Sequence, residues 1–185
     1  EASFDVQGTP LTVFVNHWPS KRGGRIRDEQ RRLVGQKLAQ LVQQKRQIDP
    51  LAKVIVLGDF NANPTEEALG PTGLGATFDR HKVCQAPAAL YHTITEISDN
   101  PTSTTLTPQD VQAMMSQQGN LVGTLFHKQW DVFDQILITP GLLTTESLGL
   151  TPHSLAVMRE PWMQTPSGKP KRFPKGQRSG APLLP

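Results

Sequence analysis

A carboxylate and an amide follow an apolar run in the first half of the chain. Residues 54–57 are Val, Ile, Val and Leu, and they lead through Gly58 to Asp59 and Asn61. Side chains two positions apart on a strand point the same way, and open α/β sheets bind ligands beyond the carboxyl ends of their strands. Asp59 and Asn61 can therefore converge on one ligand. The alternative is an Asx turn that leads the chain out of the strand.

A histidine and a second carboxylate occupy comparable positions. The apolar run 11–15 ends in Asn16 and His17, where a histidine can hold a phosphate oxygen or shuttle a proton near neutral pH. Asp134 lies early in the apolar run 133–138, where a carboxylate is costly unless a cation or a hydrogen-bond donor pairs with it. The alternatives are a structural hydrogen bond for His17 and the capping of backbone donors by Asp134.

The basic residues gather in two segments. The formal net charge of +3 divides into +4 over residues 20–32, +5 over residues 166–185 and −6 over the remainder. Lysine and arginine contact phosphate independently of sequence, so this distribution favours a polyanionic or phosphorylated ligand. Two solvated loops are the alternative interpretation.

The spacing of the apolar residues predicts an α/β arrangement. Residues 3–6 and 11–15 are β-rich runs around a turn-like spacer and predict a hairpin. After a pair of glycines, apolar positions at helical spacing predict a surface helix from near Arg27 to near Gln47. The run 54–57 is then typical of a strand buried on both faces of a central sheet. Strand, helix and strand in this order indicate an α/β fold.

The second half of the chain has weaker patterns. The predicted elements are a short helix over residues 66–68 with Thr65 as its N-cap, and a second helix that Thr107 caps, that runs through Met114 and that Gly119 ends. Strands are predicted over residues 124–132 and 133–139. Residues 151–185 are rich in Pro, Gly, Ser, Lys and Arg, and we expect irregular structure there. This tail should pack through Trp162, Met163 and Phe173.

Length and composition indicate one globular domain. Of 185 residues, 36% are hydrophobic and 19% are charged, so we expect a single domain over residues 1–185, with residues 151–185 as a basic, loop-rich tail. No run approaches the ~18 to 20 apolar residues that span a bilayer, and we expect no transmembrane segment. The lone Cys84 excludes an internal disulfide framework and leaves the compartment open. A secreted or periplasmic location is favoured over a cytoplasmic one, because bacterial secreted proteins are often poor in cysteine.

Four segments carry a family resemblance. They are residues 15–24 (VNHWPSKRGG), the Arg-rich helix that follows, residues 58–64 (GDFNANP) and residues 130–138 (WDVFDQILI). In order and spacing they resemble a bacterial branch of the endonuclease/exonuclease/phosphatase superfamily, over about residues 4–143. The resemblance implies a DNase I-like fold, which is a four-layered α/β sandwich of two mixed sheets, and this chain would supply mainly its second half. It also implies divalent-metal-dependent hydrolysis of a phosphoester.

The resemblance implies a role for each candidate residue. Asp59 would bind the metal and position the attacking water, and Asn61 would contact the scissile phosphate. His17 would contact or protonate phosphate oxygens, and Asp134 would orient a catalytic histidine. The expected metal is Mg²⁺, with Mn²⁺ or Ca²⁺ as alternatives, because a hard cation prefers carboxylate and phosphate oxygens. The expected substrate phosphate contacts are Asn16, Lys21, Arg22 and Arg25.

Two features of the family have no counterpart in the chain. The family's metal-binding Glu belongs to a first half that should precede Glu1. Its Ser-Asp-His-x-Pro motif should lie near the C-terminus, where residues 178–185 read RSGAPLLP. We therefore expect an incomplete domain that an N-terminal half or a second chain completes, and we expect the 185-residue chain alone not to be a competent enzyme.

Three functions stay open. The basic segments favour a phosphodiesterase or nuclease that acts on DNA or RNA. The second is a phosphatase or phosphodiesterase that acts on a lipid or small-molecule phosphate, since three Trp and one Tyr offer few surfaces for base stacking. The third is a non-catalytic phosphate-binding half-domain that needs a partner chain.

Overall fold

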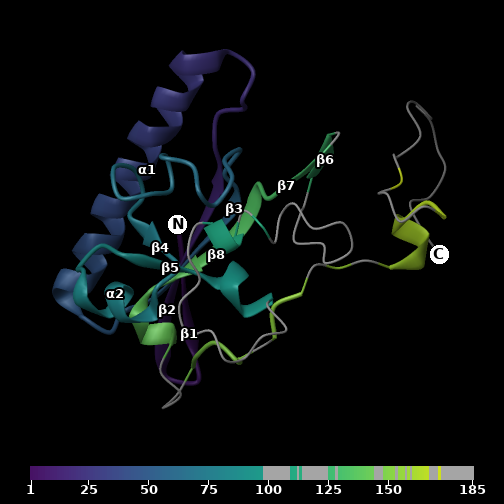
Figure 1. Ribbon diagram of the computed structural model, residues 1–185. Coiled ribbons are helices and arrows are strands. Elements are labelled where there is room, and N and C mark those ends of the chain that lie inside the picture. The colour runs from purple at the N-terminus through teal and green to yellow at the C-terminus, as the bar shows by residue number, and fades with distance from the viewer. Residues whose placement is uncertain are drawn as a thin grey trace, which may run out of the picture.

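The computed structural model describes residues 1–97, 109–111, 113, 125–127, 129–143, 148–152, 154–156, 158, 160–166 and 171. Within them, six strands form one mixed sheet in the order β1-β2-β3-β8-β5-β4, and β6 and β7 form a separate pair (Figure 1). The strands are β1 (Ala2–Val6), β2 (Thr9–His17), β3 (Lys53–Asp59), β4 (Ala76–Thr77), β5 (Leu90–His92), β6 (Leu125–His127), β7 (Gln129–Asp131) and β8 (Asp134–Ile138). The helices are α1 (Gly24–Ile48) and α2 (Arg80–Gln85), with the 3-10 helices η1 (Thr93–Ile97), η2 (Pro140–Leu142) and η3 (Pro161–Met163). This mixed α/β architecture agrees with a DNase I-like fold.

The hairpin predicted at the start of the chain is confirmed. Strands β1 and β2 are antiparallel, with Ala2 opposite Val13. Gln7 and Gly8 form the turn with φ values of 53° and 82°. Turns with positive φ at both central residues match the twist of the strands that they join, which explains why this short connection serves the hairpin.

Helix α1 covers one face of the sheet (Figure 1). It includes the predicted range and begins at Gly24, a little earlier than expected. The buried cluster between helix and sheet includes Phe14, Leu38, Val42, Val54 and Val56. Gly35 allows the following loop to approach the helix closely, because a Cβ atom there would lie 2.6 Å from the carbonyl oxygen of Ala68.

The predicted burial of β3 on both faces is only half correct. Val54 and Val56 are buried beneath α1, whereas Ile55 and Leu57, which point to the other face, are half-buried. Near η2 that second face is covered, and Ile138 is 3% exposed. Nothing of comparable size among the described residues covers it toward the carboxyl ends of β2 and β3.

The helix predicted after Thr65 is wrong. Residues 64–70 form successive turns, with the Leu69 N–H donating to the Glu66 carbonyl oxygen at 3.0 Å. The side chain that receives a backbone N–H here belongs to Glu66, whose Oε1 accepts from Asn63 at 2.9 Å. The stretch before Gly70 and Pro71 is too short to form a helix, since helix nucleation is costly.

The single strand predicted over residues 124–132 is also wrong. Its place is taken by β6 and β7, which pair with one another in antiparallel fashion, with His127 opposite Gln129. Figure 1 shows this hairpin projecting from the end of β8. The predicted strand over residues 133–139 is confirmed as β8.

The end of the chain is described only in part. Residues 109–111 and 113 are helical, as predicted, while Thr107 and Pro108 lie outside the described residues. Packing through Trp162 is wrong, because this side chain is 53% exposed, and Phe173 lies outside the described residues with most of the basic tail. None of the helices in the described part has the length and apolar character needed to cross a bilayer.

Candidate functional site

Three predicted site residues lie in one row across the sheet. His17 of β2 is directly opposite Asp59 of β3, and Asp59 is directly opposite Asp134 of β8. Residues paired across neighbouring strands point to the same face. All three side chains therefore lie at one end of the sheet, on the face opposite α1. His17 and Asp134 are exposed and Asp59 is half-buried, so the row is open to a ligand.

The histidine and the aspartate of this row are close. His17 Nε2 lies 3.8 Å from Asp59 Oδ2, which is ion-pair distance for a protonated histidine. The His17 side chain is 79% exposed and that of Asp59 37% exposed, so the pair itself adds little to stability. The pair matters for chemistry instead, because His17, a possible acid or base, and the carboxylate of Asp59 lie side by side and are both accessible to solvent.

The second oxygen of Asp59 is fixed by the backbone. Asp59 Oδ1 accepts the N–H of Asn61 at 2.8 Å, which is the Asx turn considered as the structural alternative. The turn occupies one oxygen and leaves Oδ2 directed toward His17. The structural interpretation and the functional one are thus compatible at this residue.

Asn61 is held beside Asp59 in an unusual backbone conformation. Its φ is 48°, in the left-handed region that asparagine tolerates better than most residues. The side chain is buried, and its Nδ2 donates to the Trp18 carbonyl oxygen at 3.0 Å. An amide nitrogen carries two hydrogens, so this bond uses one of them.

Gly58 explains how the two strands approach so closely before the site. Its φ is 131°, and a Cβ atom there would lie 2.0 Å from the carbonyl oxygen of Asn16. Any side chain at this position would push β2 away from β3. The glycine in the GDFN segment is therefore required by the backbone that presents Asp59.

Asn16 is not brought into the row. It precedes His17 on β2 and so points to the opposite face, toward α1. Its Nδ2 donates to the Phe14 carbonyl oxygen at 3.0 Å and to that of Leu57 at 3.3 Å. Its Oδ1 accepts from the Trp18 indole at 3.3 Å. The structure gives Asn16 the task of orienting the buried Trp18 rather than a place beside His17, Asp59 and Asp134.

Three of the six cations in the first basic segment form ion pairs with described residues. Lys21 forms an ion pair with Glu66, and its Nζ lies 4.9 Å from the centre of the Phe133 ring. Two of the arginines on α1 pair with acids one turn earlier in the helix. Within this first basic segment, fewer cations are left unpaired than the sequence indicated.

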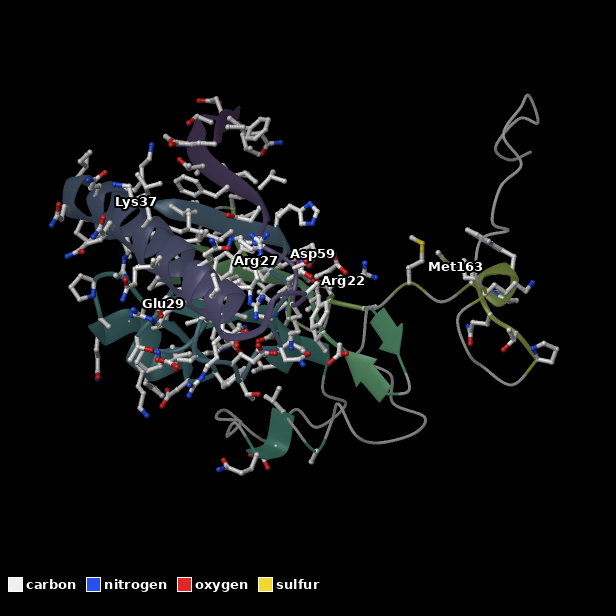
Figure 2. All side chains as sticks on the ribbon, turned by 90° about the horizontal axis from the view of Figure 1, so that it is seen from above. Arg22, Arg27, Glu29, Lys37, Asp59 and Met163 are labelled. Atoms are coloured by element: carbon white, nitrogen blue, oxygen red, sulfur yellow. The ribbon has the colours of Figure 1, made fainter. Side chains whose placement is uncertain are left out.

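Arg22 and Arg25 differ from these cations. Both are exposed, and no ion pair between described residues involves either of them. Figure 2, which views the molecule from above, shows Arg22 and Asp59 at the same end of the molecule. Arg25 lines a groove of about 510 Å³ between α1 and residues 66–68.

Two polar residues that the sequence analysis did not select connect the segments of the site. Asn63 Nδ2 donates to Asp131 Oδ1 at 2.8 Å, and Asn63 Oδ1 accepts the N–H of Val132 at 2.7 Å. Gln135 is 7% exposed and also bonds to both segments. Gln135 could have been identified from the sequence, because it is a polar residue at a position where the alternation of β8 predicts a buried side chain.

The described residues contain no group of three or more His, Cys, Asp or Glu side chains arranged to hold a metal ion. Proteins usually bind Mg²⁺ through one or two carboxylates together with water and substrate oxygens. Asp59, with Asp134 opposite it, meets that smaller requirement. The residues present thus fit a divalent cation that is shared with a phosphate substrate.

Comparison with known proteins supports the family resemblance over nearly the whole chain. The profile described as Endonuclease/Exonuclease/phosphatase family matches residues 3–184, which extends beyond the range expected from the motifs. No curated protein and no solved structure is significantly similar to the chain. The match places the chain in a family that is generally hydrolytic.

Proposed function

Because the chain belongs to the endonuclease/exonuclease/phosphatase family, we propose that it carries the active-site end of a divalent-metal-dependent phosphodiesterase that cleaves nucleic acid. The observation that supports this most strongly is the register of β2, β3 and β8. It aligns His17, Asp59 and Asp134 in one exposed row. A base, two carboxylates and open access are what hydrolysis of a phosphodiester requires.

Each residue of the row has a defined task in this proposal. Asp59 orients the attacking water through Oδ2, because its Oδ1 is occupied by the Asn61 N–H. His17 donates a hydrogen bond or a proton to a phosphate oxygen. Asn61 uses the amide hydrogen that does not bind the Trp18 carbonyl to contact the same phosphate. Asp134 orients a catalytic histidine other than His17, and we propose that further polypeptide supplies it, because the family's Ser-Asp-His-x-Pro motif has no counterpart in this sequence.

The expected cation is Mg²⁺, with Mn²⁺ or Ca²⁺ as substitutes. Asp59 would hold it together with substrate and water oxygens. When bound, it neutralises the charge that develops on the phosphoryl oxygens.

We also propose that further polypeptide covers the sheet face beside the row. Phe4 is 52% exposed, Val15 72% and Ile136 39%, although their strands pair regularly with their neighbours. An apolar surface of this kind next to a functional site is typical of a contact face. An N-terminal half or a second chain that packs there is the source we propose for the remaining acidic metal ligand.

A lipid or small-molecule phosphate is the second candidate substrate. The observation that favours it is the pairing of Lys21 with Glu66 and of two α1 arginines with acids one turn earlier, which leaves fewer cations for a nucleic-acid backbone. Arg22 and Arg25 suffice for one or two phosphates.

A substrate panel tests the proposed function. The natural gene product that contains this chain is assayed on single-stranded DNA, RNA, bis-p-nitrophenyl phosphate and p-nitrophenyl phosphate, with Mg²⁺ and with EDTA. Metal-dependent cleavage of a nucleic acid and of the diester supports the proposal. Turnover of only the monoester supports a phosphatase, and no turnover of any ester with Mg²⁺ would contradict a hydrolytic function.

A further inference from the structure

We infer that Gln135 is a positioning residue that holds the Asp59 segment against the Asp134 segment. This inference rests on the proposed function, because it concerns the geometry of the same row. Gln135 follows Asp134 on β8 and points to the opposite face, beneath the row. It does not face the substrate side and acts only through its neighbours.

The Gln135 amide nitrogen bonds to both segments at once. Nε2 donates to the Ala62 carbonyl oxygen at 2.7 Å and to the Val132 carbonyl oxygen at 2.9 Å. Ala62 directly follows Asn61, and Val132 lies two positions before Asp134. One nitrogen therefore fixes the separation between the loop that presents Asp59 and Asn61 and the turn that presents Asp134.

The orientation of this amide follows from its partners. Two carbonyl oxygens face Nε2, so the reversed amide would place oxygen against oxygen. In the orientation observed, Gln135 Oε1 is buried and has no hydrogen-bond partner among the described residues. A buried oxygen without a donor is unfavourable. Gln135 therefore leaves Oε1 without a hydrogen bond, while Nε2 bonds to both segments.

The loop that Gln135 holds needs external support. Asn61 lies at φ 48°, a left-handed conformation that asparagine tolerates better than most residues but that contacts with its surroundings still help to fix. The bonds of Asn61 to Asp59 and Trp18 fix one side of this residue. The bond from Gln135 to the next carbonyl fixes the other side.

A matched pair of variants separates positioning from stability. Gln135→Met keeps the length of the side chain and removes both donors. Thr139→Val is the control, because Thr139 directly follows β8 and is also buried, and its hydroxyl donates to Ala52 and accepts from Val54 at the opposite end of the same strand pair. Each variant loses a buried hydrogen bond to a residue that flanks β3, Ala62 for Gln135 and Ala52 for Thr139, but only the Gln135 bond lies beside the row.

The variants are compared in the natural gene product by steady-state hydrolysis of bis-p-nitrophenyl phosphate, thermal unfolding and hydrogen exchange of peptides covering residues 59–64. For Gln135→Met we expect kcat to fall by about 10²-fold with KM nearly unchanged, because small displacements of reacting groups have effects of this size. Exchange over residues 59–64 should accelerate. Thr139→Val should lose a similar amount of stability, keep kcat within about threefold and leave that exchange unchanged.

Other outcomes overturn the inference. Equal losses of kcat in the two variants at equal stability would assign Gln135 a merely structural role, as would unchanged exchange over residues 59–64. If Gln135→Met does not fold, Gln135→Glu is tested in its place, with a faster exchange over residues 59–64 expected and an unchanged one contradicting the inference. If the wild-type protein hydrolyses no phosphodiester, the proposed function fails, and the exchange comparison alone still decides whether Gln135 holds the two segments together.

Discussion

Asp59 and Asp134 stand directly opposite each other on the antiparallel strands β3 and β8. Like charges in such a pair destabilise a sheet. A cation near both carboxylates would reduce this repulsion. The pair is therefore consistent with the proposed divalent cation at the row.

Asp134→Asn tests this interpretation. Added Mg²⁺ should raise the melting temperature of the wild type more than that of the variant, because the variant has lost one of the two charges that face the cation. Thermal unfolding with EDTA and with Mg²⁺ measures the two shifts. Equal shifts in the wild type and the variant would contradict a cation that Asp134 helps to attract.

Arg22 and Arg25 should determine affinity for nucleic acid more than the rate of cleavage. Replacing both with Ala should weaken binding and reduce the slope of log affinity against log salt by about 1 for each arginine that contacts a phosphate. Lys37→Ala is the control, since Lys37 is exposed on α1, the helix that carries Arg25, but lies farther along it (Figure 2). A slope that is the same in the double variant and the control would favour the small-molecule or lipid substrate.

His92 makes the fold sensitive to acid. It is buried in the sheet and stacked on Phe78, with ring centres 4.5 Å apart, and burial lowers the pKa of His92 from 6.5 to about 3. Below pH 6.5 the unfolded chain binds a proton that the folded protein excludes, so stability is fully present above that pH and falls as the pH drops toward 3.

The variant His92→Phe keeps the ring and removes the titration. Between pH 6 and pH 4 the wild type should lose roughly 2 to 3 kcal/mol more stability than the variant. His81→Gln, at an exposed position on α2, should behave like the wild type. Urea unfolding at several pH values gives the comparison, and parallel pH profiles for wild type and His92→Phe would refute the assignment.

The exposed sheet face should be sensitive to charge if further polypeptide covers it. Val15→Lys in the natural gene product should lower stability by roughly 2 kcal/mol or more, since a buried, unpaired cation is costly. Ile48→Lys is the control, because Ile48 is 87% exposed at the end of α1. Equally small changes in the melting temperature of both variants would mean that the face stays open to solvent.

The local elements of the fold were predictable where the pattern was strong. The hairpin, α1 and the strands β3 and β8 follow from apolar spacing and turn residues. The turns over residues 64–70 were mistaken for a helix because Thr65 resembles an N-cap, whereas the close approach of this loop to Gly35 depends on tertiary packing.

The sequence allowed the residues of the site to be selected by type and position, but it did not predict which side chains contact one another. His17, Asp59 and Asp134 could be selected because each stands at a strand end, and the register then brought them together. Side chains alternate between the two faces along β2, so the sequence already implied that Asn16 points to the face opposite His17. The pairing of Lys21 with Glu66 joins residues far apart in the chain, and the bonds of Gln135 depend on where two loops meet. No local pattern contains that information.

The most direct test of the central claim compares Asp59→Asn with Asp49→Asn. Asp49 Oδ1 accepts the Leu51 N–H at 2.9 Å in the same kind of turn that Asp59 forms with Asn61, but at the opposite end of β3. An asparagine oxygen can still accept these bonds, so both variants should fold and differ only in where a charge is lost. In Mg²⁺-dependent hydrolysis of bis-p-nitrophenyl phosphate by the natural gene product, we expect at least a ~10²-fold loss of kcat/KM for Asp59→Asn and a near-normal value for Asp49→Asn. Near-normal turnover in Asp59→Asn would contradict the proposed role of the row.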